Sequence, residues 1–166
     1  MEKRENTLKT ERMRFSGRLL ERGFWLYVWK IEAEDGRCVL YVGRTGDSSS
    51  VHAGSPFNRI GQHLDFRASA KGNSMARNLR KAGIEPSHCD FDMIAIGPLF
   101  LEHNTAEQHR SIRDKVAALE CQTAKTLTDW GYEVLGTHGS RKPLDTELWT
   151  YVEDVLRQHV PPCSAT

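Results

Sequence analysis

The sequence predicts a small α+β domain in which an antiparallel or mixed β-sheet is flanked by helices. Three observations predict this fold class. Residues 24–42 have the pattern of a β-hairpin, a further strand is indicated at residues 91–96, and helical patterns fill the intervals between and after these strands. The 166 residues of the chain are enough for one domain with a buried core.

The hairpin is predicted from its composition and its turn. Residues 24–31 are rich in aromatic and β-branched side chains, which favour strands. An Asp-Gly pair follows at residues 35–36 and accepts the positive φ of a tight turn, and residues 39–42 form the return strand. Tyr27 and Tyr41 are therefore expected on paired antiparallel strands.

Two helices are expected next, after a polar loop at residues 43–54 that is rich in glycine and serine. Ser55-Pro56 is typical of an N-cap followed by proline in the first helical turn, so the first helix is expected to run from there to about Ala68. The second helix is expected over residues 73–82.

A strand and a long helix are expected in the second half of the chain. The strand covers residues 91–96 and is expected to end at residues 97–98, a Gly-Pro pair. The helix is expected to begin after capping candidates at residues 104–105 and to end near Trp130. Apolar positions at helical spacing indicate a face turned to the core, whereas His109 is expected to face solvent.

A short strand at residues 132–135 and a helix at residues 143–159 complete the expected order of elements. The expected inward positions of that helix are Leu144, Leu148, Tyr151, Val152 and Val155. Residues 1–22 are charged with scattered apolar positions and are expected to form a helical N-terminal extension. The expected core domain is then residues 23–140, with a helix and short tail at residues 141–166 packed on it.

Positive charge is clustered in one part of the chain. The net charge of +1 excludes a polycationic protein, so a DNA partner has to be argued from local clustering. Only Asp47 and Asp65 oppose the basic residues between positions 37 and 81. A solvated basic face without a partner fits this pattern equally well. The candidate nucleic-acid contacts within the cluster are Arg44, Arg67, Lys71 and Arg77.

The cysteines and the N-terminal residues bear on location. The four cysteines lie far apart and form no CxxC pair, so neither a zinc knuckle nor a redox motif is indicated. The first residues are highly charged, and no apolar run is long enough to span a bilayer. We therefore expect a cytoplasmic protein with free thiols and no membrane association. Because phosphate-binding and dinucleotide fingerprints are also missing, we expect no small-molecule cofactor.

Arg59 and His63 are the first pair with chemical potential. Their spacing of four residues places them on one face of the expected helix. An arginine can hold a phosphate through two parallel hydrogen bonds and stabilise charge that develops on it. A histidine can relay a proton or orient water near neutral pH. Taken alone, the spacing also fits a surface arginine beside a partly buried histidine.

Glu120 flanks the apolar stripe of the long helix. A carboxylate there is a natural ligand for Mg²⁺, which prefers oxygen donors and keeps several waters, although an ordinary helical glutamate fits the position as well. Tyr27 and Tyr41 are common strand residues. To activate water, they would need a cation nearby, either a metal or Arg59, that lowers a pKa ordinarily of about 10.

In this order, the residues resemble the GIY-YIG nuclease family over residues 24–137. The segment Trp25-Leu26-Tyr27 is similar to the first motif of the family, and Tyr41-Val42-Gly43 is similar to the second. The segment from Arg59 to His63 resembles the arginine-bearing helix, and Glu120 resembles the metal-binding glutamate.

The resemblance implies a DNA endonuclease that depends on Mg²⁺ or Mn²⁺. Arg59 would bind the scissile phosphate and Glu120 would hold the metal. Tyr27, Tyr41 and His63 would position or activate water.

The chain departs from the family pattern in three places. Trp25 stands where the family has glycine. The loop before Arg59 is longer than usual, so residues 45–54 are a candidate insertion that contacts nucleic acid. Glycine stands at Gly136, about where the family often has an asparagine.

Two other functions fit the same residues. A nucleic-acid-binding module on this fold predicts salt-sensitive binding without cleavage. An unrelated α+β interaction domain treats the motifs as coincidence and requires Arg59 and Glu120 to lie far apart in space. Their placement on opposite faces of the sheet would support this domain and exclude the nuclease.

Overall fold

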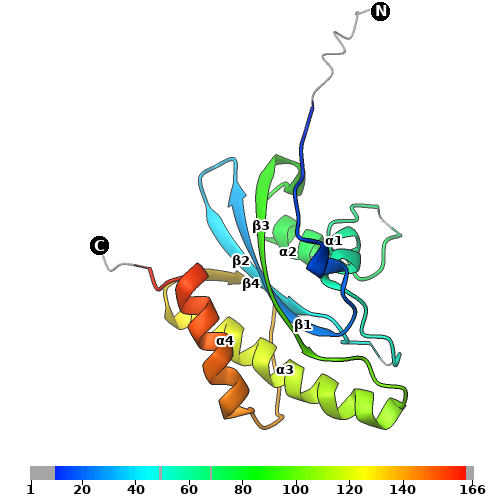
Figure 1. Ribbon diagram of the computed structural model, residues 1–166. Helices are drawn as coiled ribbons and strands as arrows, with labels where there is room; N and C mark the ends of the chain where they lie inside the picture. Colours follow the sequence, from blue (N-terminus) through cyan, green and yellow to red (C-terminus); the bar gives the residue numbers. More distant parts are fainter. Residues whose placement is uncertain (1–9, 49, 68, 164–166) are drawn as a thin grey trace, which may run out of the picture.

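The computed structural model describes residues 10–48, 50–67 and 69–163, and within them it is an α+β fold with a four-stranded mixed sheet (Figure 1). The strands are β1 (Phe24–Ala33), β2 (Cys38–Arg44), β3 (Cys89–Phe100) and β4 (Glu133–Leu135). The α-helices are α1 (Pro56–His63), α2 (Ser74–Lys81), α3 (Ala106–Asp129) and α4 (Thr146–His159). Two short 3₁₀ helices cover Gly17–Leu20 and Pro86–His88. The fold class predicted from the sequence is confirmed at this level.

The sheet has the strand order β3-β1-β2-β4. Strand β1 pairs antiparallel with both β2 and β3, whereas β4 pairs parallel with β2, which makes the sheet mixed. In the hairpin Tyr27 lies opposite Gly43, and Trp29 lies opposite Tyr41. A Cβ atom at Gly43 would lie 2.5 Å from Cε2 of Tyr27, so only glycine lets the tyrosine ring lie across this strand.

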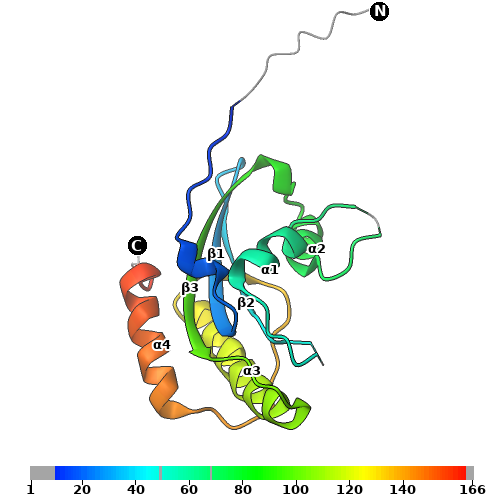
Figure 2. The same ribbon diagram turned by 45° about the vertical axis from the view of Figure 1, so that its right-hand side comes forward.

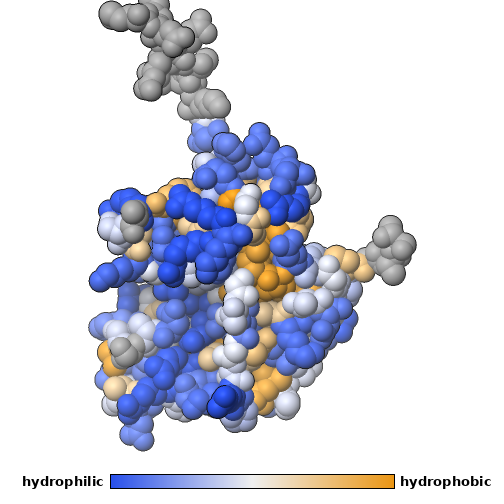
Figure 3. Space-filling view, turned by 180° about the vertical axis from the view of Figure 1, so that it is seen from behind, coloured by the Kyte–Doolittle hydropathy of each residue, from blue (hydrophilic) through white to orange (hydrophobic). Residues whose placement is uncertain are grey.

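The two faces of the sheet carry different helices, because successive strand residues point to opposite sides. Helices α1 and α2 lie over one face, and α3 and α4 lie over the other (Figure 2). The core on the α3 side includes Leu26, Val28, Leu40, Val42, Leu119, Leu127, Val152 and Leu156. The core on the α2 side includes Tyr27, Trp29, Val39, Tyr41, Met75 and Leu79. The side shown in Figure 3 is mostly hydrophilic, with a smaller hydrophobic area.

Three element boundaries differ from the sequence prediction. In the described part of the expected N-terminal helix, residues 10–22, only the 3₁₀ turn is helical, and residues 1–9 lie outside the described residues. Helix α1 ends at His63, whereas it was expected to reach about Ala68, a residue that itself lies outside the described part. The Asn73 amide donates to the backbone oxygen of Asp65 over 2.9 Å and holds the chain that leaves α1.

Strand β3 continues through Gly97-Pro98 to Phe100, beyond its predicted end. Proline is tolerated there because β3 is an edge strand and Pro98 lies where the pairing with β1 shifts register, so no residue of β1 lies directly opposite it.

Two predicted exposures are wrong. His109 is fully buried, and its Nε2 lies 3.1 Å from the carbonyl oxygen of Ser48 in the loop after β2, so loop and helix enclose it. Tyr151 was expected to face inward on α4 but is 58% exposed, while Leu156 takes a core position. Within the described residues, no helix is both long and apolar enough to cross a membrane.

Candidate active site

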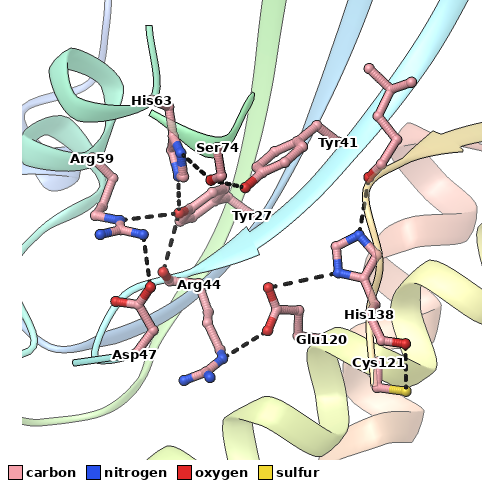
Figure 4. A network of polar contacts seen from close by, with 11 residues as sticks. Tyr27, Tyr41, Arg44, Asp47, Arg59, His63, Ser74, Glu120, Cys121 and His138 are labelled. Atoms are coloured by element: carbon pink, nitrogen blue, oxygen red, sulfur yellow. Dashed lines mark hydrogen bonds and ion pairs between the residues drawn. The ribbon is translucent and has the colours of Figure 1, made fainter. Parts of the chain in front are cut away.

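Tyr27 is at the centre of a buried polar network (Figure 4). Its hydroxyl oxygen lies 2.6 Å from Nε2 of His63 and donates to the backbone oxygen of Arg44 over 3.1 Å. Nε of Arg59 donates to the same hydroxyl over 3.5 Å. Arg59 and His63, both predicted for the site, therefore contact the same Tyr27 hydroxyl.

Helix α1 positions both of these partners. The Ser55 hydroxyl accepts from the backbone N–H of Asn58, and Pro56 fixes the first turn, so the helix begins where its sequence predicts. The four-residue spacing then turns Arg59 and His63 toward the same side, and His63 is 1% exposed.

Burial sets the protonation of this pair. It raises the pKa of Tyr27 well above the ordinary value, and the positive charge of Arg59 only partly offsets it. The expectation that Arg59 lowers the tyrosine pKa is therefore outweighed by burial. Burial also lowers the pKa of His63 to about 4, and Arg59 acts in the same direction. At neutral pH the pair is a neutral phenol beside a neutral imidazole.

Tyr41 joins the network through Ser74, which the sequence analysis missed. The two hydroxyl oxygens are 2.6 Å apart, and the Ser74 oxygen lies 3.4 Å from Nδ1 of His63. Burial raises the pKa of Tyr41, and the hydrogen bond with Ser74 lowers it. The carboxylate of Glu120 raises the same pKa and the guanidinium of Arg59 lowers it.

The Arg59 guanidinium has further partners at its outer end. One terminal nitrogen contacts the Asp47 carboxylate over 2.9 Å, and the other donates to the side-chain oxygen of Gln62 over 2.9 Å. Asp47 belongs to the loop after β2 and was counted in the sequence only as a charge that opposes the basic cluster. In the structure it lies where an anionic ligand of Arg59 would bind.

Glu120 approaches from α3, on the other side of the sheet. One carboxylate oxygen, Oε2, accepts from Nε of Arg44 over 2.8 Å. The other, Oε1, lies 3.9 Å from Nδ1 of His138, a second residue that the sequence analysis missed. The Glu120 side chain is 21% exposed, so solvent reaches the carboxylate.

The helices that carry Arg59 and Glu120 cover opposite faces of the sheet, as the interaction-domain reading predicts. Their side chains nevertheless belong to one network, because Arg44 connects the two sides. Its backbone oxygen accepts from Tyr27 beside Arg59, and its side chain donates to Glu120. Strand β4 pairs with β2 only as far as Tyr41, so on this edge no described strand pairs with the last residues of β2, whereas β1 pairs with them on the other edge.

The residues predicted to contact nucleic acid divide into two groups. Arg44 is inside the site, with its side chain only 14% exposed. Arg67, Lys71 and Arg77 are exposed on α2 and on the loop before it. Arg67 pairs with Asp65, whose pKa the Arg67 hydrogen bonds lower to about 2. These three exposed residues, called the basic surface below, lie on α2 and on the loop that leads into Ser74.

The position of the expected asparagine is also informative. Gly136 has φ of +91°, and a Cβ atom there would lie 3.1 Å from the amide nitrogen of Asn78, which comes from α2. An asparagine therefore lies beside Gly136, but from another element. Neither Asn78 nor His138 carries a local sequence signal, because both reach this place only through the fold.

A divalent cation fits the site if most of its ligands are water or substrate oxygens. Within the described residues, no group of three or more His, Cys, Asp or Glu side chains could hold a metal. Glu120 Oε1 is the carboxylate oxygen that Arg44 does not bind. One such oxygen suits Mg²⁺, which is commonly held by one or two carboxylates together with waters and phosphate.

Comparisons of the chain with protein-family models, with curated proteins and with solved structures each find no match. A functional assignment for this chain therefore depends on the chemistry of its own site.

Proposed function

We propose that the protein is a GIY-YIG-type endonuclease that hydrolyses DNA phosphodiester bonds with a divalent metal ion, Mg²⁺ or Mn²⁺. One observation carries the proposal. The Tyr27 hydroxyl contacts Nε of Arg59 and donates to the backbone oxygen of Arg44, whose side chain donates to Glu120, although Arg59 and Glu120 come from helices on opposite faces of the sheet. A phosphate-binding cation and a metal-binding anion connected through one buried hydroxyl suit phosphoryl chemistry.

Arg59 is proposed to bind the scissile phosphate. Its Nε already contacts Tyr27, which leaves the two terminal nitrogens to donate to phosphate oxygens in place of Asp47 and Gln62. A guanidinium suits this role because its parallel N–H groups match two oxygens of a phosphate.

Glu120 is proposed to hold the metal through Oε1, while Arg44 keeps Oε2 and fixes the carboxylate. When bound, a divalent cation neutralises charge on the phosphate and makes bound water more acidic.

Tyr27 and His63 are proposed to move the proton of the attacking water. A neutral Tyr27 can accept a proton only if it releases its own, so its hydroxyl must turn from the Arg44 carbonyl to donate to Nε2 of His63, which lies 2.6 Å from its oxygen. Burial and Arg59 both disfavour a charged His63, and the negative charge of a bound phosphate opposes that effect. The relay would therefore operate best with substrate in place.

A non-cleaving nucleic-acid-binding module is the second candidate. Both charged residues of the site are ion-paired, Arg59 with Asp47 and Glu120 with Arg44, as they would be in a structural network. This candidate predicts that DNA binds in a salt-sensitive manner and is not cut in any divalent metal.

A plasmid-nicking assay tests the proposal. The wild-type protein is expected to nick supercoiled DNA in Mg²⁺ or Mn²⁺ and to lose this activity in a chelator. Glu120→Gln is expected to slow nicking by at least about a hundredfold, because a metal ion contributes several kcal/mol to such reactions. The matched control is Glu107→Gln, an exposed carboxylate in the first turn of the same helix. Equal nicking by wild type and Glu120→Gln would show that the metal role of Glu120 is wrong.

A further inference from the structure

His138 lies beside Glu120, and one of its two ring nitrogens is hydrogen-bonded to the backbone. Its Nε2 lies 3.2 Å from the backbone oxygen of Leu135. A carbonyl oxygen can only accept, so Nε2 carries the hydrogen and, in the neutral ring, Nδ1 has a free lone pair. That lone pair faces Oε1 of Glu120 at 3.9 Å, and the His138 side chain is only 11% exposed.

Two electron-pair donors at this separation can share a positive charge, which is either a proton on Nδ1 or a metal ion. Arg44 does not supply it, because its Nε is bound to the other carboxylate oxygen of Glu120. Metal–nitrogen and metal–oxygen bonds of about 2.1 Å each together exceed the 3.9 Å between these two atoms, so one ion can touch both.

We infer that Nδ1 of His138 and Oε1 of Glu120 together bind one divalent cation, and that the nitrogen ligand makes the site prefer Mn²⁺, Co²⁺ or Zn²⁺ to Mg²⁺. The inference rests on the proposed function in that it concerns the same Glu120 site. Imidazole suits the later first-row ions, whereas Mg²⁺ prefers oxygen ligands.

The surroundings of His138 support this role. Its ring lies 6.4 Å from the ring of Tyr41, so an ion at Nδ1 would lie beside the proposed catalytic tyrosine. The Cys121 thiol donates to the backbone oxygen of His138 over 3.7 Å and ties the loop to α3. His138 also lines an open cavity of about 360 Å³, so part of its side chain borders solvent. The Leu135 carbonyl orients the ring through Nε2, as a second partner commonly does for histidine ligands.

Calorimetric titration of the full chain with Mn²⁺ and with Mg²⁺, in the absence of DNA, tests the inference. His138→Gln is expected to weaken Mn²⁺ binding by at least about tenfold, the lower range for loss of a group that supports a metal site, and to weaken Mg²⁺ binding much less. The matched control is His88→Gln, since His88 also faces a carboxylate, Glu34 at 3.1 Å, but both side chains are exposed. Equal Mn²⁺ affinity in wild type and His138→Gln overturns the inference.

A second measurement on the wild-type protein avoids any loss of folding in the variant. Nitrogen NMR of labelled histidines is expected to show Nε2 of His138 protonated and Nδ1 unprotonated, with the Nδ1 resonance shifting on addition of Zn²⁺. A His138 ring that is protonated on both nitrogens and unaffected by Zn²⁺ overturns the inference. If the protein cleaves DNA but His138 contacts no metal, the endonuclease proposal holds and the inference on His138 fails. If His138 binds metal but DNA is not cleaved in any metal, the inference on His138 holds and the endonuclease proposal fails.

Discussion

The Tyr27 hydroxyl lies 2.6 Å from Nε2 of His63, although the two residues are 36 positions apart in the chain. This contact joins strand β1 to helix α1 and connects the proposed water-activating residue to its proton acceptor. Removing the hydroxyl with Tyr27→Phe keeps the buried ring. We expect nicking to fall by about a hundredfold to ten-thousandfold, the usual contribution of a positioned acid or base.

The Tyr27→Phe variant is expected to remain folded, with a cost of about 1–3 kcal/mol for partners left unpaired. Urea unfolding measures this cost. Tyr132→Phe is the control, because its hydroxyl also donates to a backbone oxygen, that of Pro161, but at a distant exposed site. Activity in Tyr27→Phe equal to that of Tyr132→Phe would remove Tyr27 from the mechanism.

Burial of the His63 imidazole predicts that the free energy of unfolding depends on pH. Its pKa is lowered to about 4 in the folded protein, against about 6.5 in the unfolded chain, so the unfolded state binds more protons between these values. The contribution of the neutral His63 to the free energy of unfolding is fully present above pH 6.5 and is lost as the pH falls toward 4. Its maximum is on the order of 3 kcal/mol. Urea unfolding at several pH values between 4.5 and 7.5 measures it. His63→Gln is expected to flatten the profile in this window, whereas the exposed control His159→Gln should follow wild type.

The ion pair between Asp47 and Arg59 predicts that Asp47 competes with a DNA phosphate for the guanidinium. The two side chains are 2.9 Å apart, with exposed fractions of 40% and 19%. Asp47→Asn removes the competing charge, and we expect DNA to bind severalfold more tightly, consistent with an ion pair worth up to about 1 kcal/mol. Fluorescence anisotropy with a short duplex at fixed salt measures the change. Asp35→Asn is the control, since Asp35 pairs with Arg37 in a similar exposed contact away from the site. If both variants bind like wild type, Arg59 does not contact the DNA backbone.

The basic surface of Arg67, Lys71 and Arg77 predicts how binding depends on salt. Replacing each residue by glutamine is expected to reduce the slope of log affinity against log salt by about 0.9 for each lost phosphate contact. Binding titrations at four or five salt concentrations give this slope. The exposed Arg141→Gln serves as the control. An unchanged slope in the triple variant would place the DNA on another surface.

What the sequence predicts well is local. The Ser55-Pro56 cap, the shared face of Arg59 and His63, and the apolar stripe of α3 all depend on residues within a turn or two of one another, and all are found in the structure. The α+β class follows from the order of such elements.

The remaining features depend on contacts between distant segments. His109 is buried because the loop at Ser48 folds over α3, and the parallel pairing of β4 with β2 joins strands that are separated in the chain by α1, α2, β3 and α3. Ser74, Asp47 and His138 enter the site in the same way, through neighbours that have no fixed spacing in the chain. Periodicity and capping rules contain no information on such contacts.

Gly43 and Gly61 predict opposite effects of the same substitution. Gly43 lies opposite Tyr27, and a Cβ atom there would be 2.5 Å from Cε2 and 2.9 Å from the hydroxyl oxygen of the tyrosine ring. Gly43→Ala must therefore displace a fully buried ring, at a cost of about 1–3 kcal/mol for overpacking, and must also break the contact with His63. Gly61 lies within α1 with no atom within 4 Å of an added Cβ, so Gly61→Ala is expected to stabilise the protein by about 0.5–1 kcal/mol. Thermal unfolding and plasmid nicking of both variants measure the contrast. A Gly43→Ala protein as stable and as active as Gly61→Ala would mean that the position of the Tyr27 ring does not control the site.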